Sequence, residues 1–259
     1  MKAMSHQDLK EFLEEKVRLY NRPDFIPLDP VSIPHLFSKK EDIEIAAFLT
    51  ATIAWGQRPV ILKNARRLIS LMDDAPHDFI LNFKAKDLKR FKMFKHRTFQ
   101  AEDCFIFLRH LQAIYHSPGG LEKLVQQAIA EDDDDLSRAI STWRKAFCSI
   151  PHLVRTEKHF PNPEKGSASK RMNMFLRWMV RKDKNGVDFG LWKNISPSLL
   201  VCPLDVHSGR VARRLGILQR NQNDWKAAAE LTAFLKVLDP SDPVKFDFAL
   251  FGLGVSEKF

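Results

Sequence analysis

The chain has 259 residues, of which 44% are hydrophobic, and it contains 20 Phe but only 10 Gly and 3 Cys. This length suits one large domain or two subdomains, and three widely spaced cysteines exclude both a disulfide framework and a four-thiolate iron–sulfur cluster. The net charge of +9 favours an anionic partner. The sequence has no apolar run of roughly 20 residues and no secretory leader pattern, and this predicts a cytoplasmic protein without a membrane span.

Apolar residues recur at helical spacing in long segments rich in Ala, Leu, Lys, Arg and Glu, a pattern that predicts an all-α protein. The first predicted helix covers residues 7–20. A Pro-rich connector over 22–34 is expected to be extended and to lie on the surface. An apolar helix is predicted over 41–55, ending at Gly56, and a further helix begins just after Pro59.

The rest of the chain continues this pattern, and we expect about ten helices and no strand. The later predicted helices cover residues 78–83, 101–115, 121–130, 136–147, 170–182, 206–215 and 224–238. A loop with three Pro separates 136–147 from 170–182. Asp224 is a plausible N-cap, and Gly216 ends the helix that starts at 206.

Positive charge gathers in two stretches. Residues 84–97 hold 7 Lys and Arg against one Asp, and residues 160–230 hold 13 Lys and Arg against 6 Asp and Glu. An acidic run at 131–135 offsets part of this excess. Two separate basic clusters are typical of a surface that contacts a polyanion such as nucleic acid.

The segment CPLDVHSGRVARRLGIL contains the first candidate site residue, Asp205. The simplest interpretation is a helix N-cap whose carboxylate accepts backbone N–H bonds. Those bonds would also keep the carboxylate ionised where positive charge develops in a reaction. His207 and Arg210 follow on the same predicted helix, where they could bind phosphate groups near its N-terminus.

Lys170 is the second candidate, in the segment NPEKGSASKRMNM. The Pro and Gly residues predict a tight loop, and Ser167 or Ser169 is expected to cap the following helix. A lysine at this place is most simply a solvated cation. A lysine close to apolar surface can instead become a nucleophile that forms a Schiff base, provided that a carboxylate lies nearby.

Two further segments are candidates for DNA contact. Gln57 and Arg58 occupy a turn between two predicted helices, and such a turn can be only a turn or can probe a duplex. Arg97 lies in a basic, aromatic stretch that is either a solvated face or a phosphate contact. No metal site is expected, because Pro151 breaks the helix that would align Cys148 with His152.

Three of these segments together resemble the helix-hairpin-helix DNA glycosylases, most closely the archaeal members of the 8-oxoguanine branch. PLDVHSGRVARRLG resembles the segment of the catalytic Asp, SASKRMNMFLRWM the helix that bears the Schiff-base Lys, and AAFLTATIAWGQRP the early helix with an intercalating Gln. The usual Leu-Pro-Gly-Val-Gly hairpin is replaced by NPEKGSAS. Over nearly its whole length the chain also resembles a bacterial family of conserved proteins of unestablished function.

The resemblance implies a base-excision repair glycosylase with AP-lyase activity, acting on an oxidised purine such as 8-oxoguanine in double-stranded DNA. Lys170 would attack the sugar C1′ of a flipped nucleotide, and Asp205 would stabilise the cationic sugar and relay the amine proton. His207, Arg210 and Arg97 would hold phosphates, with Gln57 and the neighbouring Arg58 at the duplex. No cofactor, metal cluster or membrane is implied, and a nucleoid-associated monomer is expected.

The same resemblance implies two helical subdomains with a cleft between them in a single glycosylase-like unit of residues 1–259. The expected bounds are 41–165 for a central helical barrel and 1–40 plus 166–259 for the catalytic and terminal helices. Two alternatives stay open. In the first, the chain would be a non-catalytic helical DNA-binding protein on the same scaffold. In the second, it would be an enzyme that acts on another nucleic-acid or nucleotide substrate.

Overall fold

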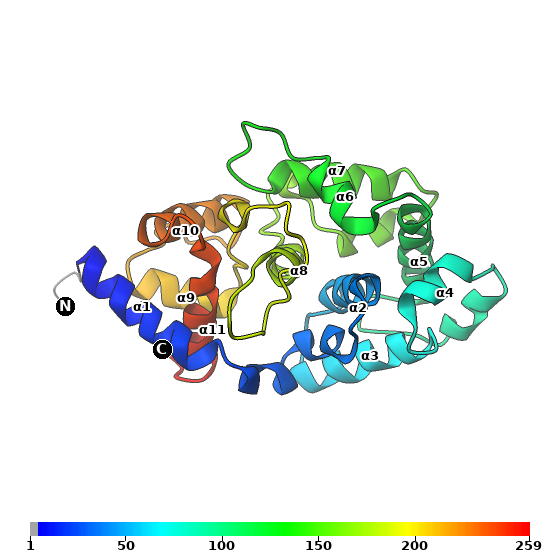
Figure 1. Cartoon of the computed structure of the whole chain (residues 1–259), viewed down its shortest axis with the longest axis horizontal. Helices are drawn as coiled ribbons and strands as arrows, with labels where there is room; N and C mark the ends of the chain where they lie inside the picture. The colour runs from blue at the N-terminus through cyan, green and yellow to red at the C-terminus, as the bar shows by residue number, and fades with distance from the viewer. Residues whose placement is uncertain (1–4) are drawn as a thin grey trace. The chain divides into compact units, whose positions relative to one another are not determined.

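The computed structural model describes residues 5–259, and it is all-α, as the sequence predicts (Figure 1). Within this range there are short 3₁₀ helices, two isolated β-bridges and no strand. The α-helices are α1 (His6–Tyr20), α2 (Lys40–Thr52), α3 (Arg58–Ser70), α4 (Pro76–Asn82), α5 (Ala101–Tyr115), α6 (Gly120–Gln126), α7 (Ser137–Cys148), α8 (Lys170–Val180), α9 (Val206–Arg214), α10 (Trp225–Leu238) and α11 (Asp247–Val255). Between residues 5 and 259, no helix combines the length and the apolar character that crossing a bilayer requires.

Several helix starts follow directly from local sequence chemistry. Ser5 and Asp8 form a reciprocal capping box at the start of α1, and the Asp224 carboxylate caps α10 by accepting the Ala227 N–H at 3.0 Å. At α3, Pro59 lies in the first turn, where its missing N–H costs no helical hydrogen bond. These boundaries lie within two residues of the predicted ones.

The Pro-rich connector differs from its prediction. It is not extended but forms three consecutive 3₁₀ helices, of which Pro23–Leu28 lies at the surface as predicted, whereas Pro30–Ser32 and Pro34–Leu36 contain buried residues. Val31 is fully buried. The φ angle that proline imposes is compatible with a 3₁₀ turn as well as with an extended chain, so the proline spacing did not exclude compact turns.

The chain divides into two compact units. Unit 1 comprises residues 1–25, 132–137 and 162–259, and unit 2 comprises 26–131 and 138–161. Relative to the expected bounds, residues 26–40 belong with the central helices, because the buried turn at Pro30–Ser32 contacts α2 and α3. The short stretch 132–137 joins unit 1, where the Lys236 amine donates to the Asp134 carbonyl at 2.7 Å.

Unit 1 is built around α1, α9, α10 and α11. The two ends of the chain lie side by side in it, since α1 packs along α11 and α11 packs along α9 (Figure 1). Its core is aliphatic, with the fully buried residues Leu13, Val211, Leu231, Leu235 and Leu250. This core fixes the start of α9, which carries Asp205 as its N-cap.

Unit 2 has an aromatic core instead. Phe48 of α2 stacks on Trp143 of α7 with ring centroids 4.9 Å apart, and Phe107 of α5 packs on Phe147 at 4.7 Å. Phe160 closes the cluster against Phe147 at 5.1 Å. Large aromatic side chains bury much area each, and they hold α2, α5 and α7 together in this unit.

Candidate active site

Lys170 and Asp205 lie next to each other in unit 1. Lys170 is the first residue of α8, Asp205 is the N-cap of α9, and the lysine Nζ is 3.4 Å from Asp205 Oδ2. Their side chains are 31% and 21% exposed, so a reactant from solvent can reach both groups. The fold therefore joins two residues that are 35 positions apart in the sequence.

The two oxygens of Asp205 have different partners. Oδ1 accepts the backbone N–H groups of His207 at 2.8 Å and Ser208 at 2.9 Å, while Oδ2 faces Lys170. The Ser208 hydroxyl in turn accepts the Asp205 N–H, which completes a capping box. Capping thus occupies one oxygen and leaves the other beside the amine, so the two interpretations of Asp205 are compatible.

This environment keeps the Asp205 carboxylate ionised. Burial alone would raise the pKa of Asp205, but the Lys170 charge and the two backbone N–H bonds outweigh it, so the pKa lies below its ordinary value. An ionised carboxylate with one oxygen fixed by amides and one directed at an amine can stabilise an adjacent cation or accept its proton.

The loop before Lys170 is tightly folded, but it does not cap α8 as predicted. The Ser169 hydroxyl donates to the Ser167 carbonyl at 3.2 Å and makes no capping bond to α8. Ser169 adopts a left-handed backbone with φ of 50°. A non-glycine residue in this region costs roughly 1–3 kcal/mol, and such strain concentrates at functional sites. The residue directly before the lysine is therefore strained rather than capping.

A third segment, residues 223–225, holds the two halves of the site in place. The Asn223 side-chain amide donates to the Asp205 carbonyl at 3.0 Å, and the Trp225 N–H donates to the Gly166 carbonyl at 3.0 Å. A bridge between Ser167 and Asp224 reinforces the second contact. One short segment thus binds both the loop that precedes Lys170 and the residue that caps α9.

Gly209 makes room for this segment. A Cβ at this position would lie 2.8 Å from Asn223 Oδ1 and 2.9 Å from Arg213 Nη1, closer than side chains tolerate. Arg213 donates to Asn223 Oδ1 at 2.6 Å and thereby orients the amide toward Asp205. Position 209 therefore requires glycine, because Asn223 occupies the space that a side chain would need.

A buried ionic network lies beneath the pair. Arg177 of α8 donates to Asp188 and Asp247, and the Cys202 thiol donates to Asp247 at 3.9 Å. Burial raises the pKa of Asp247 to about 6; Arg177 counteracts this, and the negative charge of Asp205 adds to it. The sequence prediction missed Asn223, Arg177 and Asp247, because each is a solitary residue in an ordinary helix or loop pattern.

The remaining predicted DNA contacts divide between the units. His207 and Arg210 lie exposed on α9 in unit 1, where Arg210 donates to the Gly254 carbonyl at 3.0 Å. In unit 2, Gln57 is exposed directly before Arg58, the first residue of α3. Arg97 lies beside this turn, since a Cβ on Gly56 would be 2.8 Å from its Nη1. Each unit therefore presents its own small group of candidate contacts.

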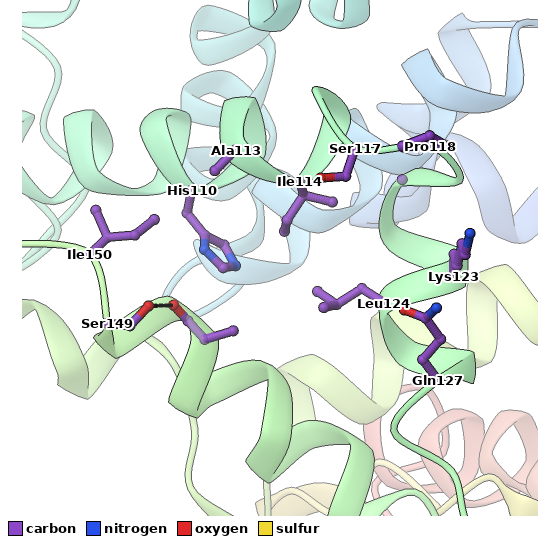
Figure 2. Close-up of a pocket in the computed structure, with 12 residues that line it drawn as sticks. His110, Ala113, Ile114, Ser117, Pro118, Lys123, Leu124, Gln127, Ser149 and Ile150 are labelled. Atoms are coloured by element: carbon purple, nitrogen blue, oxygen red, sulfur yellow. Dashed lines mark hydrogen bonds between the residues drawn. The ribbon is translucent and has the colours of Figure 1, made fainter.

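Unit 2 also contains a pocket of about 460 Å³, lined by α5, α6 and the end of α7 (Figure 2). His110 faces it, and its Nε2 accepts the Trp143 indole N–H at 2.8 Å. Burial lowers the pKa of His110 to about 3, so this side chain is neutral and structural. No residue predicted as catalytic or DNA-binding lines the pocket, and we do not place the active site there.

Among residues 5–259, one set of side chains could hold a metal. Cys148, His152 and Glu157, all in unit 2, bring a sulfur, a nitrogen and an oxygen within 4.8 Å of one another. The Lys170–Asp205 pair has no comparable donor set, and it offers an amine and a carboxylate to an organic substrate instead.

Sequence comparisons place the chain in a family without assigning it a reaction. No curated protein and no solved structure matches it, so no relative links it to the helix-hairpin-helix glycosylases. Residues 29–256, which include Lys170, Asp205 and Asn223, match the model of a protein family. The chain belongs to that family, which is described as "Protein of unknown function (DUF2400)".

Proposed function

We propose that this protein is a DNA glycosylase with AP-lyase activity, in which Lys170 is the nucleophile and Asp205 its proton acceptor and electrostatic partner. The observation that carries the proposal is the 3.4 Å separation of Lys170 Nζ from the Asp205 oxygen that the helix cap leaves unused. An amine beside a carboxylate, both open to solvent, is the arrangement that Schiff-base chemistry needs. The net charge of +9 supports a polyanionic substrate.

The reaction begins with a proton transfer. Lys170 gives one proton to Asp205 Oδ2, and its neutral nitrogen then attacks C1′ of a nucleotide flipped out of the duplex. The C1′–N bond to the base breaks, and the departing base takes the proton from Asp205. As that proton leaves, Asp205 regains its negative charge and stabilises the positive charge that develops on the sugar. The C1′–O4′ bond of the sugar then breaks, a proton passes from the attached nitrogen to O4′, and a protonated imine joins Lys170 to C1′.

Strand cleavage follows from the imine. Asp205, ionised again, accepts a proton from C2′, and the C3′–O bond breaks by β-elimination, which releases the phosphate on the 3′ side. Water then hydrolyses the imine and restores the lysine amine. By resemblance to the 8-oxoguanine branch, we propose an oxidised purine as the base released. His207 and Arg210 on α9 would contact phosphates next to the lesion.

Borohydride trapping tests this mechanism, because the reagent reduces the imine to a stable protein–DNA adduct. The full chain is incubated with duplexes that carry 8-oxoguanine, an abasic site or no lesion. We expect an adduct on lesion-bearing DNA only, and its loss in Lys170→Gln. Lys165→Gln is a matched control, since Lys165 is exposed in the same loop and should leave the adduct unchanged.

Two results would overturn the proposal. One is the absence of an adduct on every lesion tested, and the other is an undiminished adduct in Lys170→Gln. Gel-shift titration on the same duplexes identifies the alternative. Tight binding to DNA without any adduct would show a non-catalytic DNA-binding protein on this scaffold.

A further inference from the structure

The end of α7 and the loop after it contain a cluster of side chains that the proposed reaction does not use. Cys148 is the last residue of α7, His152 follows in the loop, and Glu157 lies in the 3₁₀ helix Val154–His159. Their sulfur, nitrogen and oxygen ligand atoms all lie within 4.8 Å of one another. We propose that these three residues form a zinc site with an open fourth position.

The break in the helix creates this cluster. From the sequence alone, Pro151 argues against a site because it prevents Cys148 and His152 from sharing a helical face. In the structure, the chain turns back after α7, so that the His152 ring lies against Phe147 with centroids 6.1 Å apart. The turn also brings Glu157 close as a third ligand, which the spacing between Cys148 and His152 could not indicate.

The hydrogen bonds of His152 leave the correct nitrogen for a metal. Its Nδ1 is 2.6 Å from the Ile150 carbonyl, and a carbonyl can only accept, so Nδ1 carries the proton. In the neutral ring, Nε2 then holds a lone pair. A backbone carbonyl that fixes the tautomer in this way is the usual partner of a metal-binding histidine.

The separation of the histidine and the glutamate fits a shared ion. His152 Nε2 is 3.4 Å from Glu157 Oε1. A charge-assisted hydrogen bond is shorter, at about 2.7–2.9 Å. Two ligands bound to a tetrahedral zinc at about 2.1 Å lie about 3.4 Å apart. When zinc is bound, the Cys148 sulfur must lie about 3.6 Å from each of the other two ligand atoms. In the structure it lies within 4.8 Å of both.

Arg144 prepares the carboxylate for this role. It donates to Glu157 Oε2 at 2.6 Å and to the Glu157 carbonyl at 2.8 Å, and it also bonds the Phe160 carbonyl. Oε2 is therefore occupied, and Oε1 is directed toward His152. Ligating carboxylates are typically held by such an outer hydrogen bond, so the arginine orients the ligand without occupying the ion's place.

The donor set selects the ion. One sulfur, one imidazole nitrogen and one carboxylate oxygen suit zinc, whereas magnesium and calcium prefer oxygen ligands alone. Thiolate and carboxylate together balance the two charges of the ion. The side chains of His152 and Glu157 are 9% and 34% exposed, so the ion can enter from solvent and a water can complete the tetrahedron.

Cobalt titration of the metal-depleted full chain tests the site directly. We expect one Co²⁺ per chain, with a sulfur-to-cobalt charge-transfer band in the near ultraviolet and its loss when one equivalent of Zn²⁺ is added. Cys148→Ser should abolish the band, and His152→Gln and Glu157→Gln should each weaken zinc binding at least about tenfold. His116→Gln is the matched control, because His116 also bonds a carbonyl but lies outside the cluster.

The outcomes are distinguishable from those of the borohydride experiment, because the zinc test uses no DNA and changes neither Lys170 nor Asp205. Glu157→Gln retains an oxygen that can accept from Arg144, so it tests zinc binding without loss of the local hydrogen bond. Thermal melts verify the folding of each variant. The proposal fails if the folded wild-type chain shows no stoichiometric zinc binding and no charge-transfer band. It also fails if Cys148→Ser combined with His152→Gln binds zinc as tightly as the wild type.

Discussion

Two cations on helix α8, Lys170 and Arg177, have ionic partners but differ in their exposure to solvent. At its start, Lys170 meets Asp205 through one contact of 3.4 Å that solvent can reach. Two turns later, Arg177 contacts Asp188 and Asp247, and the side chains of these three residues are only 5%, 0% and 9% exposed. The same helix thus presents one pair to reactants and keeps the other away from water.

The difference in burial distinguishes a pair that is available to a substrate from a group that stabilises the fold. A solvent-exposed pair contributes little to stability, so its partners can separate and bind a substrate at little cost. A buried pair cannot lose one partner without leaving an uncompensated charge in the interior. Loss of the buried cation, titration of Asp247 and loss of the Asp205 carboxylate should therefore change stability to decreasing extents.

Removal of the buried cation should have the largest effect. Arg177→Met leaves Asp188 and Asp247 without their shared partner, and we expect a loss of about 3–5 kcal/mol in the free energy of unfolding. Urea denaturation followed by circular dichroism measures it. Lys184→Met, at an exposed position after α8, is the control and should change stability by less than about 0.5 kcal/mol. A loss below about 1 kcal/mol in Arg177→Met would show that the network is not a structural element.

The titration of Asp247 should produce an intermediate effect. Its pKa is about 6 in the folded chain and about 3.9 in the unfolded chain, so the folded chain binds this proton more tightly. The contribution of Asp247 to stability is therefore fully present below about pH 4 and declines as the pH rises to 6. Over this window, the stability of the wild type relative to Asp247→Asn should fall by about 2–3 kcal/mol. Urea denaturation at several pH values measures it, and a constant difference contradicts the prediction.

The open pair should show the smallest effect on stability. Asp205→Ala removes the cap of α9 and should cost about 1 kcal/mol, whereas Asp205→Asn retains a capping oxygen and should cost less. Both variants should lose most of the borohydride-trapped adduct, because neither has a carboxylate beside Lys170. Denaturation and trapping on the same preparations separate the two roles. Full trapping by Asp205→Asn would limit Asp205 to its role as a cap.

Local sequence patterns predict most of the helices and one side of the candidate site. Asp205 and Asp224 are N-caps as expected, because a cap depends only on the residue and its next few neighbours. Helical spacing of apolar residues likewise locates α5, α7 and α10. The 3₁₀ turns over residues 23–36 are missed, since proline spacing alone does not separate a compact turn from an extended chain.

The long-range contacts of the site could not be predicted in the same way. Nothing in the neighbourhood of Asn223 indicates that its amide bonds the Asp205 carbonyl, because that contact depends on how two loops meet. The ionic partners Asp188 and Asp247 of Arg177 are separated from it by 11 and 70 residues. The resemblance to glycosylases suggested that Lys170 and Asp205 would meet. It gave no information about which carboxylate oxygen faces the amine.

The segment 223–225 sets the geometry of the reactive pair independently of the chain between them. Asn223 and Trp225 bind the backbone of Asp205 and Gly166, so the amine and the carboxylate are held from the side rather than through residues 171–204. Residues 184–186 of that connection are exposed and make none of these contacts, so an insertion there should leave the spacing of the pair unchanged. The spacing of the pair thus depends on three residues of one segment more than on the length of the 35-residue interval between Lys170 and Asp205.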